Sequence, residues 1–129
     1  MATSANRTTH DVQTPRTNVQ ILFANVIGGG AADCTLSTTE GRNGEVVSMV
    51  RTGAGKYTCT FRYVYPEIKM APVFSFVGTT DGLIGQCASI DITTGTAAVE
   101  VYVGNTPTDL ATTDTMHMMW AVRNSGANK

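Results

Sequence analysis

The sequence predicts an all-β protein: a single-domain antiparallel β-sandwich or barrel that is jelly-roll-like and carries an extended N-terminal arm. Three observations lead to this fold class. The 129 residues are enough for one ordinary domain and too few for two. About eight short segments rich in β-branched and aromatic residues recur at intervals of roughly 8–14 residues, separated by turns of Gly, Asn, Pro and Thr. No long window shows a helical period.

The chain divides into three parts. Residues 1–18 are polar, Thr-rich and without hydrophobic period, and Pro15 opposes regular pairing there, so we expect an extended or disordered arm. The β-domain is expected over residues 19–124, and residues 125–129 form a tail. The domain opens with the apolar run 19–27, which is short enough for a buried strand.

Gly28–Gly30 ends this first strand. The glycines lack the following helix and the G-x-G-x-x-G spacing of a phosphate-binding loop, so we interpret them as a turn. A short strand is expected at 33–37, followed by a turn at 39–44, where the dipeptide Asn43-Gly44 is a strong hairpin signal.

A hairpin is predicted next, with strands at 45–51 and 56–63 joined through Gly53 and Gly55. Its second strand alternates with a period of two, as a half-buried antiparallel strand requires. Tyr57, Cys59 and Phe61 share one face, and Thr58, Thr60 and Arg62 share the other.

Four further strands complete the domain. They are predicted at 73–78, 83–92, 96–103 and 115–123, with connections at 66–72, 79–82, 93–95 and 104–114. The last strand is unusual because both of its faces are apolar. Met116, Met118, Trp120 and Val122 share one face, and Met119 lies on the other with His117. One face is expected to meet the core, and the other is covered by either a neighbouring subunit or a loop.

Composition excludes several function classes. Charged residues make up 15% of the chain, against a usual share of about 25%, and the net charge is −1. Such a surface favours assembly, whereas the lack of a basic stripe argues against nucleic-acid binding. No apolar run approaches the ~20 residues needed to span a membrane. The N-terminus has no apolar signal-peptide core, so we expect synthesis in the cytoplasm.

The sequence contains no catalytic, cofactor or metal-binding motif. Cys34, Cys59 and Cys87 are odd in number and lack C-x-x-C spacing, which predicts three reduced thiols packed as small apolar groups. His10 lies in the arm, and His117 lies within a strand that faces solvent or a neighbouring subunit, with no nucleophile or carboxylate in a local pattern. We therefore expect neither enzymatic activity nor a cofactor.

Two groups of residues leave alternatives open. Four acidic residues fall in or near loops, where each bonds its own backbone or several hold a cation at a subunit boundary. They are Asp81, Asp91, Asp109 and Asp114. The segment 61–72 interleaves cations with aromatic residues, which is compatible with an ordinary strand edge and loop, a subunit interface or a ligand site.

Three segments together resemble a pattern in small structural proteins of tailed bacteriophages. They are VVSMVRTGAGKYTCTF (46–61), TPTD (106–109) and MMWAVRNS (118–125). In those proteins a strand ending in Arg-x-Gly-x-Gly leads to Tyr-x-Val-x-Phe or Tyr-x-Val-x-Leu, and the chain closes on an apolar strand followed by Arg-Asn-Ser. Cys59 stands where the pattern has an aliphatic residue, and residues 63–72 have no counterpart in it.

The resemblance implies a virion protein. It suggests a capsid decoration (cement) protein, often trimeric, that binds the outer capsid surface and bridges neighbouring major capsid proteins. The alternative is a tail- or head-fibre module that recognises a host receptor or glycan through loops 64–72 and 104–114. A small hydrolase is a third class, disfavoured for want of catalytic residues. The candidate interface residues are Thr9, Val12, Pro15, Tyr63, Tyr65, Met70, His117 and Met119.

Overall fold

The computed structural model describes residues 12–13, 19–37 and 46–123, and all of these lie in strands, turns or short connections. None of the described residues lies in a helix, so the predicted all-β class is confirmed. The strands are β1 (Val12–Gln13), β2 (Val19–Gly29), β3 (Ala32–Leu36), β4 (Val46–Gly53), β5 (Lys56–Phe61), β6 (Glu67–Val77), β7 (Leu83–Asp91), β8 (Thr96–Val103), β9 (Thr106–Pro107) and β10 (Thr115–Arg123).

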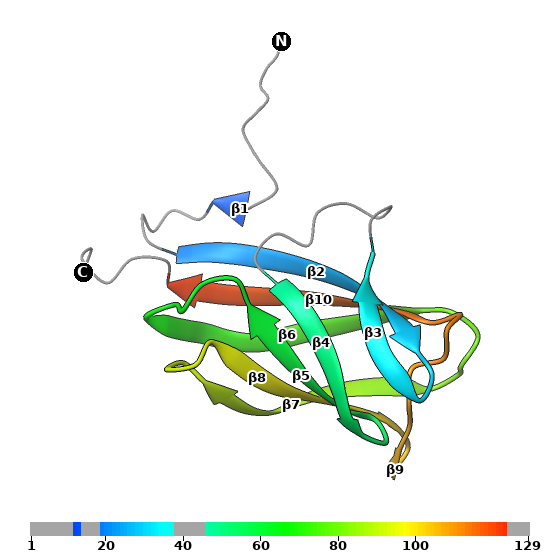
Figure 1. Ribbon diagram of the computed structural model, residues 1–129. Coiled ribbons are helices and arrows are strands. Elements are labelled where there is room, and N and C mark those ends of the chain that lie inside the picture. Colours follow the sequence, from blue (N-terminus) through cyan, green and yellow to red (C-terminus); the bar gives the residue numbers. More distant parts are fainter. Residues whose placement is uncertain (1–11, 14–18, 38–45, 124–129) are drawn as a thin grey trace.

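The strands form one curled antiparallel sheet, shown in Figure 1. The order of neighbours is β6-β10-β2-β3-β4-β5-β8-β7, with β1 added beside β2 and β9 beside β8. The sheet therefore has two halves, one built around β10 and the other around β8. The halves meet at β3, where the pairing with β4 is reduced to Cys34 opposite Met49. The jelly-roll-like strand order that we expected is not confirmed.

The two ends of this strand path lie against each other, which gives the sheet the shape of a half-barrel. Contact between β6 and β7 depends on a glycine: the ring of Phe74 in β6 packs directly on Gly85 in β7. A Cβ atom at Gly85 would lie 2.5 Å from that ring. Glycine is therefore required here by close approach rather than by backbone conformation.

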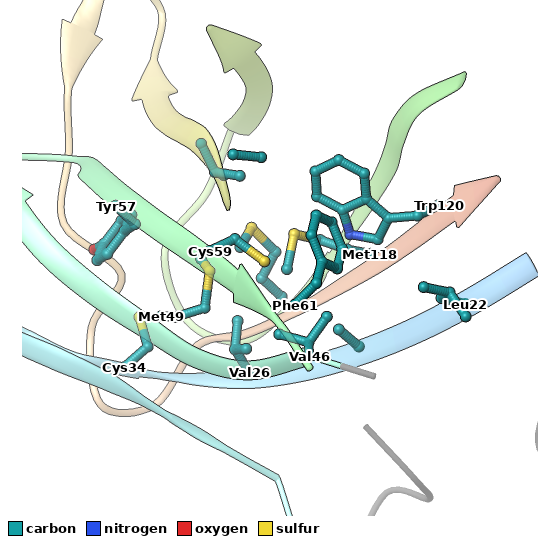
Figure 2. Packing of buried hydrophobic residues seen from close by; sticks show 14 of the residues in the cluster. Leu22, Val26, Cys34, Val46, Met49, Tyr57, Cys59, Phe61, Met118 and Trp120 are labelled. Atoms are coloured by element: carbon teal, nitrogen blue, oxygen red, sulfur yellow. The ribbon is translucent and has the colours of Figure 1, made fainter. Parts of the chain in front are cut away.

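The core fills the concave side of the sheet (Figure 2). Period-two alternation sends every second side chain of β2, β5, β8 and β10 inward, where Trp120 is completely buried. The rings of Phe61 and Trp120 meet edge to face with centroids 4.9 Å apart. Cys34, Met49, Cys59 and Met118 contribute sulfur atoms, whose polarisability suits irregular gaps in a core.

One predicted loop is in fact a strand. Residues 66–72 were expected to form a connection because prolines bracket them, but β6 begins at Glu67 and continues through Pro72. Proline is tolerated there for two reasons: β6 is an edge strand, and Pro72 lies in a bulge. Met119 pairs with Val73 and Ala121 pairs with Met70, so two residues of β6 stand opposite Trp120 alone.

Candidate functional site

An apolar groove lies on the convex face of the first half of the sheet. We call it the outer groove, with a volume of about 410 Å³. Its lining on this face comes from three neighbouring strands: Phe23 and Asn25 of β2, Val73, Ser75 and Val77 of β6, and His117 and Met119 of β10. This volume falls within the range typical of ligand and side-chain pockets.

Strand register arranges the groove in rows. Val73, Met119 and Phe23 stand opposite one another across β6, β10 and β2, and so form an apolar row. The adjacent row is polar and consists of Ser75, His117 and Asn25. Directly opposed side chains on one face of an antiparallel sheet are in contact range. The groove thus offers a few hydrogen-bonding groups between apolar surfaces.

Exposure distinguishes this face from the core. Val73 is 51% exposed, Val77 is 63% exposed and Phe23 is 37% exposed. No Asp, Glu, Lys or Arg lies among the residues that line the groove. Contiguous exposed apolar surface without charge is typical of a surface that binds another molecule.

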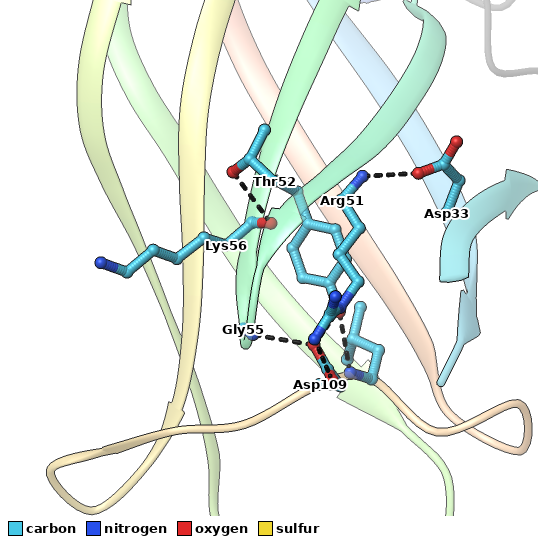
Figure 3. Close-up of polar contacts among 8 residues, drawn as sticks. Asp33, Arg51, Thr52, Gly55, Lys56 and Asp109 are labelled. Atoms are coloured by element: carbon cyan, nitrogen blue, oxygen red, sulfur yellow. Dashed lines mark hydrogen bonds and ion pairs between the residues drawn. The ribbon is translucent and has the colours of Figure 1, made fainter. Parts of the chain in front are cut away.

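A second cluster joins the β4–β5 turn to the connection before β10, and we call it the loop clasp: Arg51, Gly55, Asp109 and Asp114. Arg51 binds Asp109 through two bonds, Nε to Oδ1 and Nη2 to Oδ2, each 2.9 Å long (Figure 3). The backbone N–H of Gly55 also donates to Asp109, at 2.8 Å. The Arg51 hydrogen bonds, helped by that of Gly55, lower the pKa of the Asp109 carboxyl despite partial burial.

Asp114 holds the other end of the same connection through hydrogen bonds. Its side chain is fully buried and accepts bonds from the N–H groups of Thr79, Thr80 and Ala111 and from the hydroxyl of Thr80. Burial by itself raises the pKa of this carboxyl, but the four donors outweigh burial and leave the pKa below its ordinary value. The carboxylate is therefore a structural acceptor.

The acidic residues do not converge on a metal site. Within residues 12–13, 19–37 and 46–123, no group of three or more His, Cys, Asp or Glu side chains could hold a metal ion. Asp91 accepts bonds from the N–H and hydroxyl of Thr93 in its own turn, as expected for a turn residue.

The cysteines are free thiols, as predicted. Cys34 and Cys59 are buried and Cys87 is partly buried. Burial raises the pKa of Cys59 to about 12 and that of Cys34 to about 11, and it also raises the pKa of Cys87. All three are thus protonated and unreactive at neutral pH.

The structure brings together only part of the predicted interface set. His117 and Met119 both line the outer groove, on the face opposite Trp120. Tyr63 is 58% exposed, but Tyr65 is buried, with its ring edge-on to Phe61. Tyr65 is therefore part of the core and does not present a contact surface.

The remaining predicted residues belong to edge strands or lie outside the described chain. The backbone of Met70 lies in β6 opposite Ala121, and Val12 lies in β1 opposite Ile21. Thr9 and Pro15 lie outside the described residues, as does the Asn43-Gly44 dipeptide.

Sequence reasoning missed Phe23, Val73 and Val77. Phe23 stands in the continuous apolar run 19–27, which gives no sign of which face is buried. In β6, the alternation of Val73, Ser75 and Val77 with Phe74 and Phe76 was the available signal.

Comparison with known proteins gives no match: no family model, no curated protein and no solved structure matches the chain. Among the residues that the structure describes, no helix is long and apolar enough to cross a membrane.

Proposed function

We propose that the protein is a structural component of a bacteriophage virion, a capsid decoration protein that binds other proteins through the outer groove. The observation that carries this proposal is a contrast between the polar side chains of the loop clasp and the apolar side chains of the outer groove. The carboxylates of the loop clasp are committed to internal bonds, whereas the outer groove exposes uncharged apolar side chains on a hydrogen-bonded sheet.

The loop clasp supports the resemblance on which the virion proposal rests. Two of the resembling segments, R-T-G-A-G (51–55) and T-P-T-D (106–109), are far apart in sequence. They meet where Arg51 and Gly55 both bind Asp109. These two segments of the pattern therefore form one structural unit, a hairpin turn fastened to a loop.

The proposed mechanism is mechanical. The protein, as a homotrimer on the outer capsid surface, bridges neighbouring major capsid proteins and so opposes the pressure of packaged DNA. A contact of standard size buries ~1,600 Å² and gains a large hydrophobic free energy. Only the part of this free energy that exceeds the entropy and desolvation costs of association contributes to affinity. In a trimer, binding at one contact raises the effective concentration of the other two, so the trimer binds more tightly than a single contact would.

Catalysis is a weaker interpretation of the same groove. Ser75, His117 and Asn25 have the residue types of a nucleophile, a base and an orienting group, and they are cross-strand neighbours. However, His117 lies on β10, the central strand of the three, and Ser75 and Asn25 lie on its neighbours β6 and β2. Backbone N–H groups of a strand lie in the plane of the sheet and do not point out of its faces, so those of these strands do not point into the groove, where an oxyanion would need donors. A rigid binding surface accounts for the row without that requirement.

Copy number is the primary test. Quantitative mass spectrometry of purified virions should find hundreds of copies in fixed ratio to the major capsid protein. A handful of copies per particle would instead place the protein in a tail or fibre and favour recognition of a host receptor or glycan. Its absence from particles would refute the virion proposal.

A matched pair of variants tests the groove itself. Val73→Glu places a charge in the groove, and Ile84→Glu places one on β7, outside it; the two side chains are 51% and 55% exposed on edge strands. Binding to undecorated heads should be lost in Val73→Glu and retained in Ile84→Glu, because burying an unpaired charge is costly. Equal binding by both variants would exclude the outer groove as the contact surface.

A further inference from the structure

One edge of β2 is only partly covered. The other edge pairs with β10 without interruption from Val19 to Ile27. On the partly covered edge, β1 pairs with Gln20 and Ile21, and β3 begins to pair only at Val26. No strand within the described residues pairs with Leu22–Ala24 on this side.

The backbone at the centre of this gap points outward. The carbonyl of Asn25 faces the uncovered edge, because it accepts a bond of 2.8 Å from the N–H of Ser37 after β3. Backbone groups of a strand alternate between its two edges, so those of Phe23 and Ile21 face the same way as those of Asn25. Leu22 and Ala24 face β10 instead. Phe23 thus directs one N–H and one C=O into the gap.

The chain itself supplies a segment of matching length and direction. β1 is antiparallel to β2, with Val12 opposite Ile21 and Gln13 opposite Gln20. If this register continued beyond Val12, residue 10 would stand opposite Phe23. Eleven residues precede Val12, and three of them, at about 3.3 Å each, span the gap.

We propose that Leu22–Ala24 form a strand-addition site and that residues 9–11 of the same chain occupy it, continuing β1 in register. His10 and Phe23 then exchange two backbone hydrogen bonds. A Thr-His-Asp segment suits this role, because an edge strand is recognised mainly through its backbone. The donor is the same chain because β1 already places Val12 at the end of the gap, so that no rearrangement is needed.

This inference is independent of the virion proposal and changes what the arm does. An uncovered edge next to the exposed Phe23 would be a template for pairing between copies. With residues 9–13 bound to β2, the edge is covered, and these residues are not available to reach a neighbouring protein.

Amide hydrogen exchange of the full chain, measured by NMR without capsids, tests the proposal. The N–H of Phe23 should be protected, as should those of Leu22 and Ala24, which bond to β10 and serve as internal controls for folding. His10→Pro removes the N–H that donates to Phe23 and cannot sit in a paired position, so the Phe23 amide should exchange about tenfold faster. Asp11→Pro removes an N–H that points away from β2 and should leave the Phe23 amide unchanged.

Three outcomes would overturn the proposal. The first is a Phe23 amide that exchanges in the full chain as fast as an uncovered edge. The second is an identical response to both proline variants while Leu22 and Ala24 stay protected. The third is protection of Phe23 that grows with protein concentration, because a second copy would then donate the strand.

Discussion

The loop clasp and the outer groove use their side chains in opposite ways. In the clasp, Arg51, Asp109 and Asp114 direct their hydrogen-bonding groups to partners inside the molecule. In the groove, Val73 and Val77 expose more than half of their surface and contribute little to the core. This difference implies that stability should depend on the clasp and binding on the groove. Four predictions test that separation, from the largest expected effect on stability to the smallest.

Loss of the Asp114 carboxylate should be the most damaging change. Asp114→Ala leaves four donors around a fully buried site without their acceptor, so we expect the free energy of unfolding to fall by about 3 kcal/mol or more. Urea unfolding followed by circular dichroism measures this loss. Asp114→Asn retains one acceptor oxygen and should lose less. A stability equal to that of the unchanged protein would mean that water replaces the carboxylate and that the clasp is not essential.

The turn of the clasp should distinguish its two glycines. Gly55 has φ of +66°, and a Cβ there would lie 2.5 Å from the carbonyl oxygen of Val101, whereas nothing lies within 4 Å of a Cβ at Gly53. Gly55→Ala should therefore cost about 2 kcal/mol or more, because a left-handed conformation is unfavourable for a residue with a side chain. Thermal melting of Gly55→Ala and of the matched control Gly53→Ala checks this. Similar midpoints for the two variants would contradict the turn geometry.

Acidification should weaken the clasp through its carboxylates. The pKa values of Asp109 and Asp114 are lowered in the folded protein. A carboxyl group of this kind stabilises fully above its unfolded pKa, ordinarily 3.8, and the contribution is lost as pH falls through the lower folded value. Stability should therefore decline below about pH 4.

The Asp109→Asn variant tests how much of this loss of stability at low pH comes from the Arg51–Asp109 ion pair. It keeps an acceptor for the Gly55 N–H but loses the ion pair with Arg51, and it should cost about 1 kcal/mol at neutral pH. Its melting midpoint should also fall less between pH 5 and pH 2 than that of the unchanged protein. An acid response identical to that of the unchanged protein would show that the Arg51–Asp109 pair does not stabilise the fold.

Substitution in the groove should have the smallest effect on stability. Val73→Glu changes an exposed side chain on an edge strand, so the free energy of unfolding should change by no more than about 0.5 kcal/mol. Urea unfolding of this variant beside Ile84→Glu measures the difference. A large loss in Val73→Glu alone would mean that the groove is part of the folded core rather than a binding surface.

Much of the fold could be predicted from local pattern. The strands β5 and β10 alternate with a period of two, and their buried faces are the predicted ones. The pattern was insufficient in β6, where two prolines suggested a loop. Only the bulge opposite Trp120 and the position of β6 at the sheet edge make Pro72 compatible with a strand.

The candidate site was predicted in part. The alternation of β10 placed His117 and Met119 away from the core, and both line the groove. Phe23 and Val73 join them only because β2 and β6 are the two neighbours of β10, at a register that no local pattern specifies. Tyr65 shows the opposite error, since its tyrosine character suggested an interface and its packing on Phe61 buries it.

The sequence by itself determined the β-class, the hairpin, the inward face of β10 and the inert thiols, because these follow from residue type and from contacts between near neighbours. The tertiary structure decided which strands adjoin, and with them both the groove and the clasp. Arg51 and Asp109 are 58 residues apart in the chain. Their bond depends on how the curled sheet brings distant segments together, and that long-range pairing is set by the sum of many burial and register terms rather than by any short stretch of sequence.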